Sequence, residues 1–248
     1  MRLSLDGLRK LHETEPALHR LGFVVDTNAL FAIATPSDRL NTWAHATFRA
    51  LGKFPISAYS NINIRTEFMD LQRRVMIPEG LVTFYDIKDK DSMNLHLKTQ
   101  LRSLKTQMER ATKEDRVFKL SDQAIKKYRA IFEAGSPGAW ELFCRDFLYP
   151  QISEVWDATI TELNLQFLGT RAIESREYFS RDPNWKDMTD IMGSFGIGSA
   201  DAMIVNFFLC SKFPLIVTGD EDVAYAVERL SDGTKYVLVP AAGEDLLQ

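Results

Sequence analysis

Short apolar runs near both ends of the chain alternate with segments in which apolar residues recur every three or four positions. The runs lie at 23–25, 54–57, 213–217 and 236–239. Runs of this length are typical of buried strands in a parallel sheet, and the spacing between them is typical of helices. Strands separated by helices imply right-handed crossovers. The pattern therefore predicts an α/β fold with a mostly parallel sheet.

The middle of the chain, 71–194, has a different pattern, because its apolar residues recur only at helical spacing. These stripes are Leu97, Leu101, Leu104 and Met108; Ile125, Tyr128 and Phe132; Trp140, Phe143 and Phe147; and Ile152, Trp156, Ile160, Leu163 and Phe167. We interpret them as the core of four or more packed helices. The chain is thus expected to form one domain over 1–248, with a core at about 20–70 and 195–241 and an all-helical insertion at 71–194.

Polar residues before two of the predicted helices are expected to cap them, because a side-chain oxygen there accepts a hydrogen bond from a free backbone N–H. The expected caps are Ser37 or Asp38 for a helix over 40–51, and Ser60 or Asn63 for the helix that carries Glu67. The apolar face of the helix over 40–51 is expected to comprise Trp43, Phe48 and Leu51.

Composition is typical of a soluble protein from a reducing compartment. Of its 248 residues, 45% are hydrophobic and 11% aromatic, more than a disordered chain contains, and no apolar run approaches the ~20 residues of a membrane span. Cys144 and Cys210 have no metal-ligand spacing, and two cysteines form no disulfide framework. The charged N-terminal stretch lacks the apolar region of a signal peptide. We therefore expect a cytoplasmic protein with no membrane partner.

Acidic residues stand out in four segments that are far apart in the chain: Asp26, Glu67, Asp201, and Asp220 with Asp222. Asp26 and Asp220 follow predicted strands, so both should emerge at the carboxyl edge of the sheet, where ligands bind in open α/β folds. Glu67 and Asp201 lie in helical patterns that would pack beside those strands. Gathered carboxylates repel one another unless a cation lies among them, and hard oxygen ligands suit Mg²⁺ or Mn²⁺.

These segments resemble the PIN-domain metal-dependent nucleases, a family that includes the toxins of many bacterial toxin–antitoxin pairs. The resemblance rests on Asp26-Thr27-Asn28 after a strand, Glu67 in R-T-E-F, Asp201-Ala202 at the start of a helix, and a closing T-x-D-x-D at Thr218, Asp220 and Asp222. It covers roughly the first third and the last fifth of the chain. It implies a PIN-like three-layer α/β/α core and a ribonuclease that requires Mg²⁺ or Mn²⁺.

The resemblance also implies a role for each residue of the motif. Asp26, Glu67, Asp201 and Asp220 would be catalytic; Asp26, Asp201, Asp220 and Asp222 would hold metal; Asn28 and Thr218 would fix the ligand carboxylates by hydrogen bonds. For Asp222, capping of the following helix is an equal alternative. Each acid taken alone has an ordinary explanation as a cap or a solvated carboxylate, and only the joint pattern favours a metal site.

The histidines disfavour a metal-free ribonuclease. His12, His19, His45 and His96 are scattered, and none lies beside an acidic segment. A histidine acid–base pair that drives attack by the 2′-hydroxyl is therefore not expected. A divalent ion would instead lower the pKa of a bound water and place it in line with the phosphorus. We expect a divalent-metal-dependent endoribonuclease that hydrolyses RNA phosphodiester bonds with this water.

Basic residues gather within the insertion although the chain has a net charge of −4. Residues 101–130 hold nine Lys or Arg against four acids, an excess of five positive charges. Lys98, Arg102 and Lys105 lie at i, i+4 and i+7 and would form a stripe on one helix, a track for a phosphate backbone. The alternative is an ordinary solvated helix face.

Other functions stay open at this point. A catalytically inactive PIN-like module that binds RNA or protein is one alternative, and a DNA flap-type nuclease is another. A haloacid-dehalogenase-type phosphotransferase is disfavoured, because its motif has a second acid where this chain has Asn28. The partners expected are an RNA substrate, an antitoxin or other protein partner, and a second copy of the chain in a homodimer.

Overall fold

The computed structural model describes residues 1–88, 93–169 and 177–241. The chain forms two compact units. The first, here called the sheet unit, comprises Met1–Pro36, Leu40–Phe68 and Thr159–Gln248. The second, the helical unit, comprises Ser37–Arg39 and Met69–Ala158. The acidic segments all belong to the sheet unit.

The described part of the sheet unit contains a single six-stranded sheet in which every pair of neighbours is parallel. Its order is β1-β6-β5-β2-β3-β4. The strands are β1 (Arg2–Leu3), β2 (Phe23–Val25), β3 (Ala58–Asn61), β4 (Leu165–Leu168), β5 (Leu215–Val217) and β6 (Tyr236–Leu238). Central β2 and β5 are buried at every position, as expected for apolar runs covered on both faces. Val25 pairs with Val217, so β2 and β5 end side by side.

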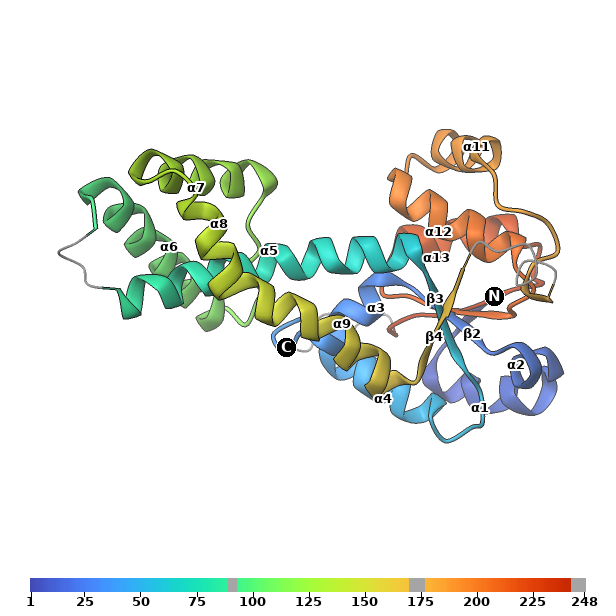
Figure 1. The fold of residues 1–248 in the computed structure, drawn as a ribbon. Coiled ribbons are helices and arrows are strands. Elements are labelled where there is room, and N and C mark those ends of the chain that lie inside the picture. The colour runs from blue at the N-terminus through green and yellow to red at the C-terminus, as the bar shows by residue number, and fades with distance from the viewer. Residues whose placement is uncertain (89–92, 170–176, 242–248) are drawn as a thin grey trace. The chain divides into compact units, whose positions relative to one another are not determined.

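Helices lie on both faces of this sheet. Figure 1 shows α11, α12 and α13 on one face and α1, α2 and α4 on the other, an arrangement compatible with three layers. The helices that lie wholly in the sheet unit are α1 (Leu5–Thr14), α2 (Pro16–Leu21), α3 (Thr27–Ala34), α4 (Asn41–Leu51), α11 (Trp185–Phe195), α12 (Ser199–Cys210) and α13 (Glu221–Leu230). The predicted α/β class with a parallel sheet is confirmed.

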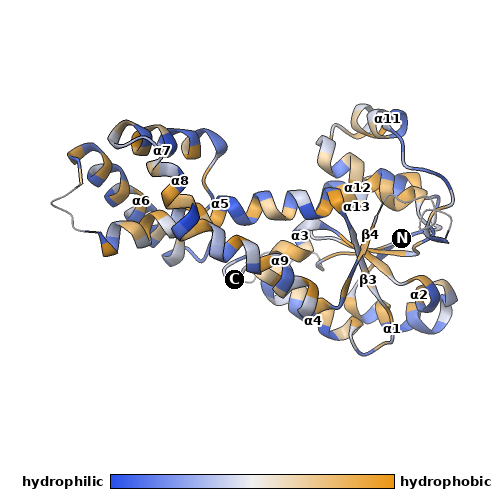
Figure 2. Cartoon of the chain, in the orientation of Figure 1, coloured by the Kyte–Doolittle hydropathy of each residue, from blue (hydrophilic) through white to orange (hydrophobic). Residues whose placement is uncertain are grey.

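The helical unit is built from amphipathic helices, which show both hydrophilic and hydrophobic colours in Figure 2. Its elements are most of α5 (Ile62–Ile87), α6 (Leu95–Lys113), α7 (Asp122–Gly135), α8 (Ala139–Phe143), the π-helix η1 (Cys144–Leu148) and most of α9 (Tyr149–Leu163). Leu101 and Leu104 of α6 are buried together with Tyr128 and Phe132 of α7. The two predicted apolar stripes of these helices are confirmed.

The predicted position of the second strand, 54–57, is wrong: the strand β3 lies four residues later, at Ala58–Asn61. Pro55 has no N–H to donate to a neighbouring strand, and the Phe54 and Ile56 N–H groups donate within a turn. The predicted caps are also wrong. Asn61 caps α5, because its Oδ1 accepts the N–H groups of Asn63 and Ile64, both at 3.0 Å.

Helix α4 begins without the predicted Ser37 or Asp38 cap; Leu40 precedes it, and no side chain caps it. Of its predicted apolar face, Trp43 and Leu51 are buried and Phe48 is half-buried. Arg49, in its last turn, is exposed.

The insertion over 71–194 is not all helical, because β4 lies inside it and pairs with β3. Phe167, predicted on a helix, is in this strand and is 45% exposed. Helix α9 ends at Leu163 because Asn164 adopts the left-handed conformation, with φ of 47°. The helical unit correspondingly ends at Ala158.

Among the described residues, no single helix has the length and apolar character to cross a membrane. Helices α11 and α12 meet that criterion only when taken together, as a pair bent by 119°.

Candidate active site

Asp26 lies at the carboxyl end of β2 and is buried, with 1% of its surface exposed. Its N–H donates to the Val217 carbonyl at 2.9 Å, which continues the pairing of β2 with β5 by one residue. Its side chain caps α3, since Oδ1 accepts the Thr27 N–H at 2.6 Å. Its other oxygen, Oδ2, accepts the Thr218 hydroxyl at 2.5 Å.

Burial raises the pKa of Asp26 to about 7. This value already includes a smaller rise caused by the nearby acids Glu67 and Asp220, and a lowering by the hydrogen bonds from Thr218 and Thr27. The carboxyl group therefore titrates far above the usual range of an aspartate. A cation beside it would favour its charged form, because an opposite charge lowers the pKa of an acid.

Asp220 follows β5 and caps α13. Its Oδ1 accepts the N–H groups of Asp222 at 2.8 Å and Val223 at 3.3 Å. Its Oδ2 accepts the Asn28 amide at 3.2 Å, and its own N–H donates to the Thr218 hydroxyl at 2.9 Å. The cap of α13 is thus Asp220 and not Asp222, whose side chain is left on the exposed first turn.

Glu67 and Asp201 reach the same site from helices. Glu67, on α5, accepts the Thr27 hydroxyl at 2.8 Å. Asp201 lies in the first turn of α12, where it accepts the Gly198 N–H. The pKa of Asp201 is raised to about 6, chiefly by burial and then by the nearby acids Asp220, Glu67 and Asp222. Thr27 and Asn28, which follow Asp26, bind Glu67 and Asp220, and Asp201 lies near enough to Glu67 and Asp220 for them to raise its pKa. The structure therefore brings all four segments together.

The beginnings of α3, α12 and α13 meet at this site, each with an acid in its cap or first turn. A helix N-terminus carries partial positive charge, which favours a carboxylate there. Each acid therefore has a local structural role. The pKa values of Asp26 and Asp201 are raised nevertheless, chiefly by burial and to a lesser extent by the neighbouring acids.

Gly219 allows the loop after β5 to pass close to α4. A Cβ atom at this position would lie 2.4 Å from Cδ1 of Leu40, which is buried. Gly198 is similarly close to its neighbour, because a Cβ there would lie 3.1 Å from Oδ2 of Asp201. Both glycines leave room for the positions of the adjacent acids.

The donor set fits Mg²⁺ or Mn²⁺ chemically, since carboxylate oxygens are the ligands these hard cations prefer. Within residues 1–88, 93–169 and 177–241, however, no three His, Cys, Asp or Glu side chains are disposed to hold a metal ion as they stand. Both oxygens of Asp26 and both of Asp220 accept hydrogen bonds from the protein. A bound cation would have to draw these carboxylates together or reach them through water.

Sequence reasoning missed the role of Thr27. Its N–H binds Asp26 and its hydroxyl binds Glu67, so one residue links the strand-end acid to the helical acid. Its place in the D-T-N motif is the signal that marks it. Asn28 and Thr218 do contact the predicted ligand carboxylates, while their role toward a metal stays a prediction.

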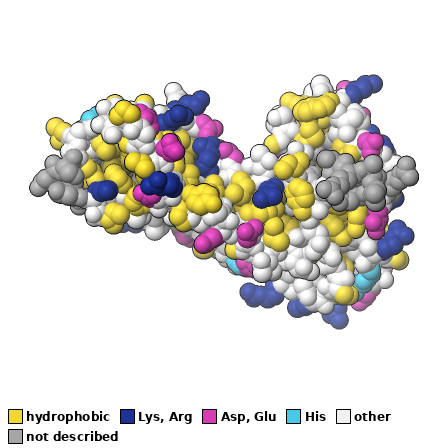
Figure 3. Space-filling model, in the orientation of Figure 1, with side chains coloured by type: hydrophobic (Ala, Val, Ile, Leu, Met, Phe, Trp, Pro, Cys, Tyr) yellow, Lys and Arg dark blue, Asp and Glu magenta, His cyan; other side chains and the backbone are white. Residues whose placement is uncertain are grey.

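The predicted basic stripe lies in the helical unit, on α6. Lys105 is bound by Asp86, with both carboxylate oxygens 2.8 Å from Nζ. Lys98 is half-buried, and Arg102 is exposed. Acidic and basic side chains of the helical unit lie close to one another on the face in Figure 3. The stripe is therefore partly neutralised, and its role in RNA binding stays a prediction.

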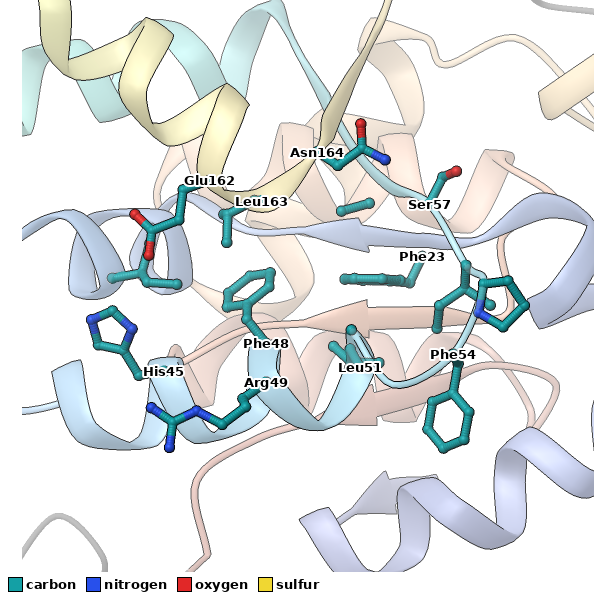
Figure 4. Close-up of a pocket in the computed structure, with 15 residues that line it drawn as sticks. Phe23, His45, Phe48, Arg49, Leu51, Phe54, Ser57, Glu162, Leu163 and Asn164 are labelled. Atoms are coloured by element: carbon teal, nitrogen blue, oxygen red, sulfur yellow. The ribbon is translucent and has the colours of Figure 1, made fainter.

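A separate cavity of about 560 Å³ lies at the opposite edge of the sheet, where β2 and β3 begin (Figure 4). Phe23, Phe48 and Phe54 line it together with His45 and Arg49. None of the predicted site residues lines this cavity.

No family model, no curated protein and no solved structure matches this chain. The resemblance to PIN-domain nucleases therefore rests on the motif residues and their order alone. The class defined by fold and site is an α/β protein whose parallel sheet carries a cluster of carboxylates at its carboxyl edge.

Proposed function

We propose that the protein is a divalent-metal-dependent endoribonuclease with a PIN-like three-layer core. The observation that carries this proposal is the gathering of Asp26, Glu67, Asp201 and Asp220 at one edge of the sheet, with the pKa values of Asp26 and Asp201 raised. A cation among these buried and mutually repelling carboxylates would stabilise their charged forms.

Each residue of the site would have its own role in metal binding or hydrolysis. Asp26, Asp201 and Asp220, with Asp222 at the rim, would hold Mg²⁺ or Mn²⁺. A divalent ion, when bound, supplies a lowered pKa for water and neutralises charge on the phosphate. Glu67 would orient the attacking water. The contacts of Thr27, Thr218 and Asn28 keep the carboxylates in place.

An RNA substrate, a cytoplasmic location, and partners such as an antitoxin or a second copy of the chain belong to the same proposal. They rest on the resemblance. The motif pattern supports RNA as the substrate more directly than it supports any protein partner.

A catalytically inactive PIN-like module is the second candidate, and two observations favour it. Asp26, Asp201 and Asp220 each accept hydrogen bonds at the start of a helix, which gives them a structural role without metal. No three acidic, histidine or cysteine side chains of the described residues are poised to hold an ion. The two candidates differ in whether metal binds.

Thermal unfolding in EDTA and in Mn²⁺ separates them. A metal at about 100 times its dissociation constant stabilises the fold by about 2.7 kcal/mol, which raises the melting temperature of a chain of this size by about 5–10 °C. Asp26→Asn should lose this gain. Asp6→Asn is the matched control, since Asp6 is an exposed acid in the first turn of α1. A wild-type melting temperature that is the same in both buffers would favour the inactive module.

A further inference from the structure

An apolar pocket of about 380 Å³ lies at the carboxyl ends of β3 and β4. These strands follow β2 in the sheet, on the side away from β5. The pocket is thus at the same edge as the acid cluster, next along the row of strand ends. Its volume is within the range of about 300–1,000 Å³ that small-molecule sites have.

The floor of this pocket is aromatic and aliphatic. Leu168, Met203, Phe179 and Phe207 line it, and the last two rings meet edge to face with centroids 5.2 Å apart. Trp185 lines it from the start of α11 and is 70% exposed. Hydrophobic side chains reach the surface over α11 in Figure 3. Among the described residues no aromatic ring packs against Trp185, and its exposed indole could stack on a flat ligand.

Polar groups line the remaining wall. Asn61 is buried and uses its Oδ1 to cap α5, while its Nδ2 donates to no described residue. Asn63, Asp182 and Asn184 also line the pocket. Together they offer amide donors and carbonyl or carboxylate acceptors beside an apolar floor. This combination suits a planar ring with a polar edge.

The pocket adjoins the acid cluster through two shared helices. Asn63 of the pocket and Glu67 of the cluster are one turn apart on α5, so they lie on the same face of that helix. Met203 and Phe207 belong to α12, whose first turn carries Asp201. A ligand in the pocket would therefore lie beside a phosphate at the carboxylates.

We propose that this pocket receives an unstacked base of single-stranded RNA, next to the phosphate that is cut; the assignment rests on the proposed nuclease function. Proteins that bind single strands stack bases on aromatic side chains and read their polar edges by hydrogen bonds. In a duplex the bases are paired and stacked, so they cannot enter. The substrate class is accordingly single-stranded RNA.

Equilibrium dialysis of the full chain in EDTA tests the pocket without catalysis. AMP, GMP, CMP and UMP are the probes, and ribose 5-phosphate, which has no base, is the reference. At least one nucleotide should bind, and ribose 5-phosphate should not. Trp185→Ala should weaken nucleotide binding about 5- to 150-fold, the range measured for loss of one stacked base, and Trp185→Phe should restore most of it.

Tyr149→Ala is the matched control, because Tyr149 is another exposed aromatic residue and does not line the pocket. It should bind nucleotides as the wild type does. Equal loss in Tyr149→Ala and Trp185→Ala, or equal binding of ribose 5-phosphate and nucleotides, overturns the proposal.

RNA binding in an Asp26→Asn background, in EDTA, extends the test to the polymer. A single-stranded oligonucleotide should bind more tightly than its duplex, and Trp185→Ala should remove that preference. The outcomes distinguish the two proposals. Nucleotide binding by a protein that cuts no RNA refutes the nuclease and keeps the base pocket. Metal-dependent cleavage that is unaffected by Trp185→Ala, with no nucleotide bound, keeps the nuclease and refutes the pocket.

Discussion

The hydroxyl of Thr218 donates a 2.5 Å hydrogen bond to Oδ2 of Asp26, across 192 positions of sequence. The same hydroxyl accepts the Asp220 N–H at 2.9 Å. One small side chain at the end of β5 thus positions the acids that follow two neighbouring strands. This contact also lowers the pKa of Asp26 against the effect of burial.

Replacing Thr218 with Val should destabilise the fold by about 1–3 kcal/mol, because a buried carboxyl loses its donor and a backbone N–H loses its acceptor. The pKa of Asp26 should rise further, so Mn²⁺ binding should require a higher pH. Urea unfolding and the pH midpoint of Mn²⁺ binding measure the two effects. Thr218→Ser keeps both hydrogen bonds and should resemble the wild type; a Val variant that does so as well would show that the contact is unimportant.

The contribution of Asp26 to the stability of the metal-free protein should fall as pH rises from about 4 to about 7. The folded-state pKa of Asp26 is about 7, and an unfolded Asp has a pKa of about 3.9. Below both values the group is protonated in both states and has no effect. Between them only the unfolded state ionises, so unfolding becomes easier. The full penalty, on the order of 4 kcal/mol, is present above pH 7.

Asp26→Asn cannot ionise and should escape this penalty. In EDTA, its stability relative to the wild type should increase by up to about 4 kcal/mol between pH 4 and pH 8. Denaturant unfolding at both pH values gives this difference. Asp201 titrates in a nearby window in both proteins, so its contribution largely cancels. A difference that does not change with pH would contradict the raised pKa of Asp26.

Gly219→Ala should destabilise the protein by about 1–3 kcal/mol, because the new Cβ would lie 2.4 Å from buried Leu40 Cδ1. The variant should also bind Mn²⁺ more weakly, since the loop between Thr218 and Asp220 has to move. In a Leu40→Ala background the same substitution should have a much smaller effect. A double-mutant cycle by urea unfolding measures this coupling, and strictly additive effects would rule out the contact.

If the basic stripe binds RNA, replacing its residues should change the salt dependence of binding to different extents. Replacing Arg102, which is exposed, with Gln should flatten the dependence of log K on log salt for single-stranded RNA by about 0.7, the slope of one phosphate contact. Replacing Lys105 alone should change it less, because Asp86 already neutralises Lys105. Fluorescence anisotropy over a salt series gives the slopes. Unchanged slope and affinity in Arg102→Gln would mean that the stripe is an ordinary solvated helix face.

The strands that were predicted from the sequence are those buried on both faces. β2, β5 and β6 are short apolar runs that are typical of buried strands, and all three form within the predicted segments. β3 begins four residues later than predicted, at Ala58, because Pro55 lies within the predicted run at 54–57. The segment that does form the strand contains no proline. β4 was missed because Leu163 and Phe167 continue a helical spacing that Asn164 interrupts with its left-handed backbone.

The proximity of Asp26 and Asp220 could be predicted from the sequence, because parallel strands have their carboxyl ends at one edge of a sheet. The side-chain contacts could not. That Thr27 links Asp26 to Glu67, and that Asp220 caps α13 ahead of Asp222, depends on rotamers and hydrogen-bond geometry that spacing does not encode. The same contacts supply the ordinary structural role of each acid, which is why metal binding needs an experiment.

The most direct test is the chemistry of the RNA ends. A single-stranded RNA is incubated with wild type or with identically purified Asp26→Asn, in Mn²⁺ or in EDTA. Attack by water predicts products with a 5′-phosphate and a 3′-hydroxyl, formed by the wild type only and only with metal, and a 2′-deoxy group at the scissile position should not prevent cleavage. Products ending in a 2′,3′-cyclic phosphate, cleavage in EDTA, or equal cleavage by Asp26→Asn would contradict the proposed function.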